Sequence, residues 1–202
     1  MVRVGRILNP LSTFDFLDSA IIKSTVKLTD GLTCHIYAGE IEHWLTKVLG
    51  IYATLARRTN DSRMTLANEG AFLLVYEESV REIRSKLNTI EHITHERFRP
   101  NLVVDRDNVE RFYPAYHEDL WKRVIICKEN PIELKSIGLC QRCSIVNIDP
   151  STGQNQSRLF TRLQTERREK SSFRANFGIL LSLSHGNQST FIHVGDRIQA
   201  FE

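Results

Sequence analysis

Two cysteines with an arginine between them form the group in this chain best suited to do chemistry. Cys140 and Cys143 lie three residues apart in the stretch GLCQRCSIVNIDPSTG, and Arg142 directly precedes the second. Such a pair can be half of a zinc site, a redox-active pair, a ligand set for another soft metal, or two buried thiols. Because a guanidinium favours a neighbouring thiolate and attracts anions, Arg142 suggests a soft metal and an anion at one site.

Zinc and redox chemistry each lack part of their usual pattern. A structural zinc site takes four ligands, often from two Cys-x-x-Cys pairs, and this chain has one pair. Cys127 and His117 are candidates for the missing ligands, but their spacing matches no standard zinc pattern. A thioredoxin-type pair opens a helix, whereas the β-branched residues after Cys143, in SIVNID, predict a strand. These two alternatives are disfavoured, and a cofactor ligand and a pair of packing thiols stay open.

A second candidate for anion binding lies in the segment RFRPN. Pro100 disfavours helical backbone in the residue before it, so Arg99 is predicted to be extended. Asn101 offers both hydrogen-bond donors and an acceptor. An arginine beside such an amide at the start of a strand can hold an anion, and a surface ion pair is the alternative for Arg99.

The fold that must position these residues is predicted to be mainly β (α+β). Alternating or β-branched segments recur along the chain, and the segment Asp149 to Gly153 has proline and glycine at turn positions. Many short strands with polar turns are typical of a barrel or a sandwich. The predicted strands are IKSTVKL, LTCHIYA, FLLVY, FRPNLVVD, KRVIICK, IELKSI, CSIVNID and TFIHVGDRIQAF.

Three helices are predicted beside the strands. The first is GEIEHWLTKVLG, with Gly50 as its C-cap, and a capping box from Ser79 to Glu82 begins the second. The third spans residues 157–168. The apolar stripes expected to face a core are Ile41, Trp44, Leu45, Val48 and Leu49 in the first helix, Val80, Ile83 and Leu87 in the second, and Leu159, Phe160 and Leu163 in the third.

Composition excludes several classes of protein. The 202 residues suffice for one sizeable core, and a net charge of +3 does not call for a nucleic-acid partner. No run of about 18 apolar residues predicts a membrane span, and the N-terminus lacks the apolar core of a secretory signal. Four cysteines do not make the dense disulfide framework of a secreted domain, so a cytoplasmic location is expected.

Six motifs in order carry a resemblance to a known family. They are TLANEGAFLLVYEESV, RFRPNLVVD, HEDLW, GLCQRCSIVNIDPSTG, NFGILL and VGDRI, within the range Ala38 to Ile198. Together they resemble the MOSC domain, and specifically the C-terminal part of eukaryotic molybdenum cofactor sulfurases. The resemblance implies a MOSC-type β-barrel with a few peripheral helices.

The resemblance also implies a ligand, the molybdenum cofactor, which is a pterin with a dithiolene and a phosphate. Cys143 matches the cysteine that binds molybdenum in the related amidoxime-reducing proteins, and Cys140 is left as a packing residue. No catalytic residue is implied. The cofactor-binding residues that the resemblance implies are Arg99, Asn101, Arg142, Cys143 and Asn68.

The family's sulfurases supply the expected partners. There, an N-terminal pyridoxal-phosphate domain takes sulfur from L-cysteine, and the cofactor held on the MOSC domain is sulfurated for xanthine dehydrogenase and aldehyde oxidase. This chain has no pyridoxal-phosphate domain, so it is expected to hold molybdopterin for such a domain and not to be catalytically complete alone. Neither a nucleic acid nor a membrane is an expected partner. A reductase of N-hydroxylated compounds and a non-catalytic fragment are the alternatives.

The beginning of the chain departs from the family pattern. The usual Tyr-Pro-x-Lys-Ser segment is not found. Residues 1–37 are therefore expected to be strands that remain from an N-terminal subdomain, and residues 38–202 to be the MOSC domain. Loss of that segment is expected to weaken phosphate binding and to leave an edge of the barrel open.

Overall fold

The computed structural model describes residues 2–7, 22–27, 33–58, 70–87, 93–106, 113–127, 129–155, 158–168, 174–184 and 191–202. The chain divides into two compact units. We call Met1–Asn9 with Glu69–Glu202 the barrel unit, and Pro10–Asn68 the small unit. The boundary expected between residues 37 and 38 falls inside the small unit.

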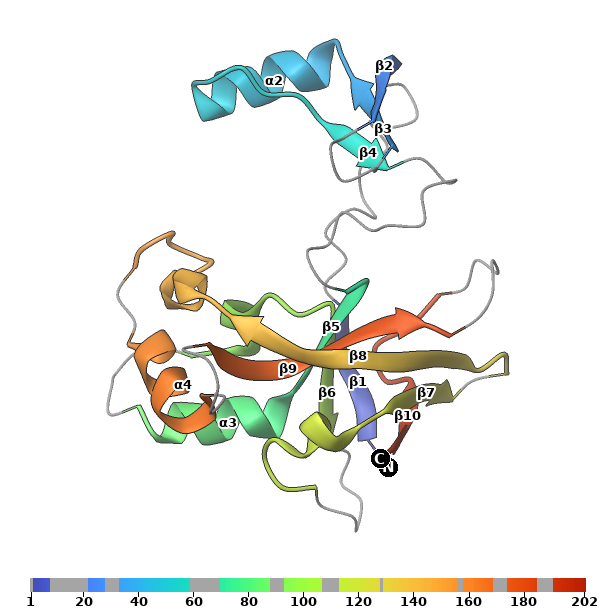
Figure 1. Ribbon diagram of the computed structural model, residues 1–202, viewed down its shortest axis with the longest axis vertical. Coiled ribbons are helices and arrows are strands. Elements are labelled where there is room, and N and C mark those ends of the chain that lie inside the picture. The colour runs from blue at the N-terminus through green and yellow to red at the C-terminus, as the bar shows by residue number, and fades with distance from the viewer. Residues whose placement is uncertain are drawn as a thin grey trace. The chain divides into compact units, whose positions relative to one another are not determined.

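The barrel unit is a closed barrel (Figure 1). Its described strands are β1 (Val2–Ile7), β5 (Phe72–Tyr76), β6 (Leu102–Arg106), β7 (Arg123–Cys127), β8 (Ile132–Arg142), β9 (Ala175–Leu183) and β10 (Arg197–Phe201). Around the barrel they follow the order β1-β10-β7-β8-β9-β5-β6. Only β5 and β6 pair in parallel among these strands. The mainly β prediction is confirmed, but the expected open edge is not found, because β1 pairs with both β6 and β10.

Apolar residues fill two layers, because successive side chains of a strand face opposite sides. In β5, Leu74 and Tyr76 belong to one core cluster, to which six strands contribute. Leu73 and Val75 belong to a second cluster, which includes residues of both helices of this unit. Since both faces of β5 are covered, the run Phe72–Tyr76 is apolar throughout instead of alternating.

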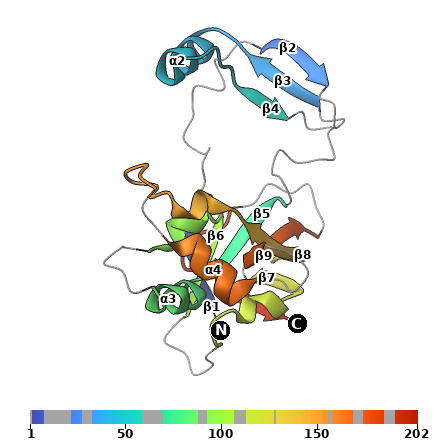
Figure 2. The ribbon, with the colours of Figure 1, turned by 60° about the vertical axis from the view of Figure 1, so that its left-hand side comes forward.

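Two helices, α3 (Glu77–Ser85) and α4 (Leu159–Arg167), pack on the strands (Figure 2). Their predicted stripes are mostly buried, with Val80 and Leu159 fully so. The predicted capping box is wrong, because α3 begins two residues before Ser79, whose hydroxyl bonds elsewhere. Among the described residues, no helix is both long and apolar enough to cross a membrane.

The small unit has a three-stranded antiparallel sheet, built from β2 (Ile22–Lys27), β3 (Thr33–Tyr37) and β4 (Ala56–Arg58). Helix α2 (Glu40–Leu49) connects β3 to β4 and ends as predicted at Gly50, which is left-handed with φ 68°. The expected core packing of α2 is wrong for the described residues. None of its residues is buried, and Trp44 and Val48 are more than half exposed.

Candidate functional site

The cysteine pair lies where β8 ends and a one-turn 3-10 helix, η3 (Ser144–Asn147), begins. The predicted strand after Cys143 is therefore wrong, because the strand β8 contains Cys140 and ends just before Cys143. Cys140 is a buried strand residue, as expected for packing, whereas Cys143 is exposed at the N-cap of η3. The two thiols thus have different surroundings, and only Cys143 can reach a ligand in solvent.

Arg142 is buried and points into the protein framework. Its Nη1 donates a hydrogen bond to Cys140 Sγ at 3.1 Å, and its Nη2 donates to the backbone oxygen of Phe98 at 2.6 Å. Its guanidinium carbon lies 5.8 Å from the centre of the Phe98 ring. Both terminal nitrogens therefore donate to protein atoms. This favours a role for Arg142 in positioning its neighbours over direct contact with an anion.

Arg99 is exposed at the end of another one-turn helix, η1 (His95–Phe98). The predicted extended backbone is wrong, because Arg99 is left-handed with φ 52° and ψ 48° and its N–H donates to Glu96 O at 3.0 Å. This cap turns the chain from η1 toward β6. No described residue forms an ion pair or side-chain hydrogen bond with Arg99. Its charge is therefore available to an anionic ligand.

Asn101 joins the start of β6 to β5. Its Oδ1 accepts a hydrogen bond from Leu73 N at 2.8 Å, and its own N–H donates to Leu73 O at 2.9 Å. The side-chain oxygen is thus committed to the sheet, which leaves the amide nitrogen to donate to a ligand. Asn68 lies outside the described residues.

One hydrogen bond brings the two exposed candidates to adjoining segments. Arg142 directly precedes Cys143, Phe98 directly precedes Arg99, and Arg142 Nη2 bonds Phe98 O. The side chain of Arg142 therefore bridges the two segments that carry Cys143 and Arg99, which are 44 positions apart in the chain. A soft sulfur ligand and a positive charge on two bridged segments suit a soft metal that carries an anionic group.

A third arginine of this region was not identified as a candidate from the sequence. Arg97, only 4% exposed, donates from Nη1 to Asn147 O at 2.9 Å and forms an ion pair with Asp149 at 3.2 Å. The predicted turn at Asp149 is confirmed, since Gly153 is left-handed and its N–H donates to Asp149 O at 2.7 Å. The signal available in the sequence was the repeated arginine of RFRPN.

A polar pocket of about 330 Å³ opens beside this ion pair. Its lining consists of Thr94, His95, Glu96, Arg97, Asp149, Pro150 and Ser151. Hydrogen bonds to the Ser151 hydroxyl and N–H hold the pKa of Asp149 below its ordinary value, which keeps the carboxylate charged opposite Arg97. The pocket has charges of both signs, so its lining does not select one class of ligand.

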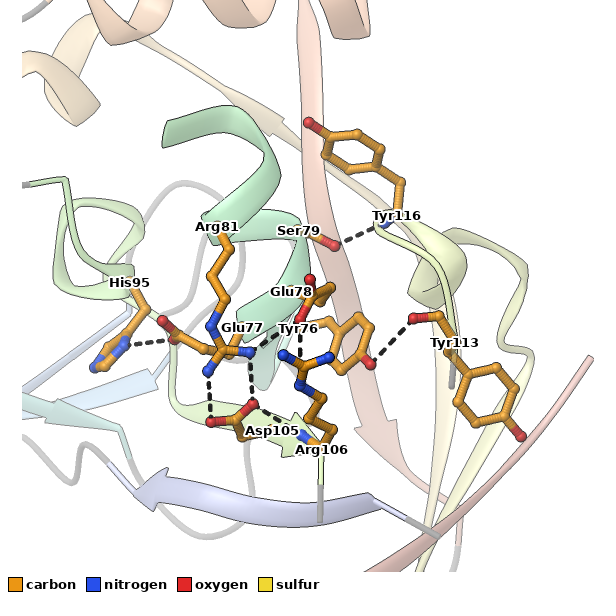
Figure 3. A network of polar contacts seen from close by, with 10 residues as sticks. All are labelled: Tyr76, Glu77, Glu78, Ser79, Arg81, His95, Asp105, Arg106, Tyr113 and Tyr116. Carbon is orange, nitrogen blue, oxygen red and sulfur yellow. Dashed lines mark hydrogen bonds and ion pairs between the residues drawn. The ribbon is translucent and has the colours of Figure 1, made fainter. Parts of the chain in front are cut away.

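A separate polar network fixes α3 to η1 and β6 (Figure 3). Arg81 donates two hydrogen bonds to Asp105, at 3.0 and 2.9 Å, and a third to Glu78. His95 Nδ1 lies 2.8 Å from Glu77 Oε2. Through the last contact, the first turn of α3 supports the helix that ends at Arg99.

The zinc and redox alternatives find no support in the described part of the chain. Cys127 ends β7 and His117 Nε2 lies 2.8 Å from Glu202, and no three metal-binding side chains gather within the ranges given above. All four cysteines belong to those ranges and are free thiols. Because Cys140 lies within a strand, the pair also lacks the helix that a thioredoxin-type site opens with its first cysteine.

Comparison with known proteins identifies the family. Residues 61–199 match the model of the MOSC domain. The chain is 26% identical over 201 residues to a molybdenum cofactor sulfurase of Caenorhabditis briggsae, which covers 95% of this chain and 27% of that protein. A molybdenum cofactor sulfurase of Solanum lycopersicum is 27% identical, covering 80% of this chain and 22% of the relative. A molybdenum cofactor sulfurase of Homo sapiens is 24% identical, and the match covers 88% of this chain and 22% of the relative.

The chain spans about a quarter of the length of these relatives. The match at residues 61–199 includes every described strand of the barrel except β1 and the last two residues of β10. It includes Arg99, Asn101, Arg142 and Cys143, the described residues of the candidate site. Because the match covers more than half of the chain, this protein belongs to the MOSC domain family.

Proposed function

We propose that this chain binds the molybdenum cofactor, with Cys143 as the ligand of molybdenum and Arg99 as the partner of an anionic group of the pterin. The observation that carries the proposal is the 2.6 Å hydrogen bond from Arg142 to Phe98 O, which brings the segments of these two exposed residues together. The names of the relatives, all molybdenum cofactor sulfurases, support the same ligand.

The donors at this position fit such a cofactor. An exposed thiol is a suitable ligand for a soft metal, and an exposed guanidinium binds phosphate through a planar pair of donors. Asn101 contributes its amide nitrogen at the start of β6. When bound, the cofactor would supply the molybdenum atom that receives sulfur, and the residues of this chain would hold and orient it.

The larger role follows from the relatives and is part of the proposal. This chain would present the cofactor in the cytoplasm to a pyridoxal-phosphate domain that releases sulfur from cysteine. The sulfurated cofactor would then pass to an enzyme such as xanthine dehydrogenase or aldehyde oxidase. In this role the chain contributes binding, and its partner contributes the sulfur chemistry.

The test measures molybdenum by mass spectrometry and pterin by fluorescence after oxidation, in the 202-residue chain purified from a host that makes the cofactor. We expect both in the wild type, a loss of molybdenum of at least about tenfold in Cys143→Ala, and a loss of both in Arg99→Ala. Cys127→Ala, which removes a thiol at the end of β7, is the matched control and should retain both.

Two results would contradict the proposal. The first is a wild-type chain that retains zinc but no pterin. The second is equal retention of molybdenum by Cys143→Ala and Cys127→Ala. If the loaded chain reduces N-hydroxylated compounds with an electron-donor system, the reductase alternative replaces the sulfurase role while the cofactor site stands.

A further inference from the structure

Two arginine side chains connect the segments that hold Arg99 and Cys143, one extending from each segment to the other. Arg142, at the end of β8, donates to the backbone oxygen of Phe98 in η1. Arg97, in η1, donates to the backbone oxygen of Asn147 in η3 and pairs with Asp149 just beyond it. We call these two arginines with their acceptors the arginine clasp.

Burial makes the contacts of the arginine clasp obligatory. Arg97 is 4% exposed and Arg142 is 9% exposed, so neither guanidinium can exchange its protein partners for water. A buried charge whose partners are removed is unstable, and the surrounding chain must rearrange to hydrate it. The clasp therefore restrains both segments as long as the barrel unit is folded.

The restraint extends from η3 into the elements around it. Asn147 uses its backbone oxygen for Arg97 and its side-chain Oδ1 to accept a hydrogen bond from Phe160 N at 2.8 Å, in the first turn of α4. Asp149 accepts hydrogen bonds from the N–H and hydroxyl of Ser151, at 2.8 and 2.6 Å. A loss of Arg97 would therefore remove the hydrogen bond and the ion pair that hold Asn147 and Asp149, shortly after Cys143, to η1.

We propose that Arg97 is a positioning residue of the cofactor site, which together with Arg142 fixes the placement of Cys143 relative to Arg99. This inference rests on the proposed function for the identity of the ligand, but the restraint itself belongs to the protein alone. Arg97 does not need to touch the cofactor. It limits the motion of η3, so that the thiol and the guanidinium of Arg99 are held ready for a rigid ligand that contacts both.

The first test follows the protein without any cofactor. Hydrogen exchange measures the backbone amides of residues 144–149, and iodoacetamide measures the reactivity of Cys143. We expect Arg97→Met to speed exchange in this segment by at least about tenfold and to raise the alkylation rate of Cys143. Arg97→Lys should restore part of the protection. Its single ammonium can bond Asp149 or Asn147 O, but it cannot bond both at once as the planar guanidinium does.

Arg81→Met is the matched control. It also removes an arginine with two hydrogen bonds to one carboxylate, but that carboxylate, Asp105, belongs to β6 and not to η1 or η3. We expect it to lower the melting temperature and to leave exchange in residues 144–149 unchanged. If Arg97→Met does not fold, Asp149→Asn removes the ion pair more gently and should show the same local effect.

The second test compares retained molybdenum and pterin in Arg97→Met, Arg97→Lys and Arg81→Met. We expect Arg97→Met to lose most of both, Arg97→Lys to be intermediate and Arg81→Met to resemble the wild type. Unchanged exchange and alkylation in Arg97→Met and Asp149→Asn would overturn the clasp, and so would equal cofactor loss in Arg97→Met and Arg81→Met. A wild type without pterin would instead reject the proposed function, and the exchange data would then decide the restraint separately.

Discussion

The buried carboxyl group of Glu118 should make the barrel unit less stable as the pH rises. Glu118 lies in the one-turn helix η2 (His117–Leu120) and is fully buried. Its Oε2 accepts a hydrogen bond from Ser79 Oγ at 2.7 Å, while Oε1 has no partner among the described residues. Burial raises the pKa of Glu118 from 4.5 to about 7, and the neighbouring charge of Asp119 adds to the rise. Near neutral pH this carboxyl group is therefore partly protonated.

The sign and size of the effect follow from these values. Between pH 4.5 and about 7 the folded protein holds this proton and the unfolded chain has released it, so stability from this group is present at low pH and lost as pH rises. A pKa that moves from 4.5 to about 7 corresponds to about 3 kcal/mol, since a factor of ten in proton affinity is worth about 1.4 kcal/mol. Glu118→Gln removes this dependence because an amide does not titrate.

Urea unfolding of the wild type and of Glu118→Gln at pH 4.5 and pH 8 measures the effect. The free energy of unfolding of the wild type, relative to the variant, should fall by about 2–3 kcal/mol between the two pH values. Contributions from groups common to both proteins cancel in the difference. Glu129→Gln, at an exposed position, controls for the change in net charge. A difference between wild type and Glu118→Gln that is the same at both pH values would refute the reasoning.

Two further substitutions test the framework around the site. Gly178→Ala should lower the free energy of unfolding by about 2–4 kcal/mol in urea, because Gly178 has φ 76° and an added Cβ would lie 2.6 Å from Leu74 O. An alanine variant as stable as the wild type would contradict this. Asn101→Ala should cost about 1–3 kcal/mol because it leaves Leu73 N without its acceptor. Asn101→Asp keeps an acceptor and should recover part of that stability, and equal losses in the two variants would show that the hydrogen bond contributes little.

The fold was accessible from the sequence where the signal is local. The alternation in Ile22–Lys27, the apolar run Phe72–Tyr76 and the glycine at the end of α2 each depend on neighbours in the chain, and the structure confirms them. The closure of the barrel was not accessible in this way. β1 pairs with β6 and β10, about 100 and 195 residues further along, and no short-range pattern reports such a pairing.

Tertiary context also reversed two local signals. The β-branched residues of SIVN predict a strand, but they form η3, whose Val146 is buried in the cluster with α4. The apolar stripe of α2 predicts a core position, and yet Trp44 and Val48 are exposed in the small unit. In both cases the local sequence pattern gives only a preference, and the tertiary contacts of the segment determine its secondary structure and burial.

Burial is what separates the roles of the three arginines near the site. Residue type gives Arg97, Arg99 and Arg142 the same capacity to bind an anion, and the sequence favoured the second and third. Arg97 and Arg142 are buried, and their terminal guanidinium nitrogens donate within the protein, across separations of up to 52 and 44 residues. Arg99 alone of the three is exposed and has no partner among the described residues. A ligand can therefore take its charge from Arg99, while the other two determine where that charge and the thiol of Cys143 are held.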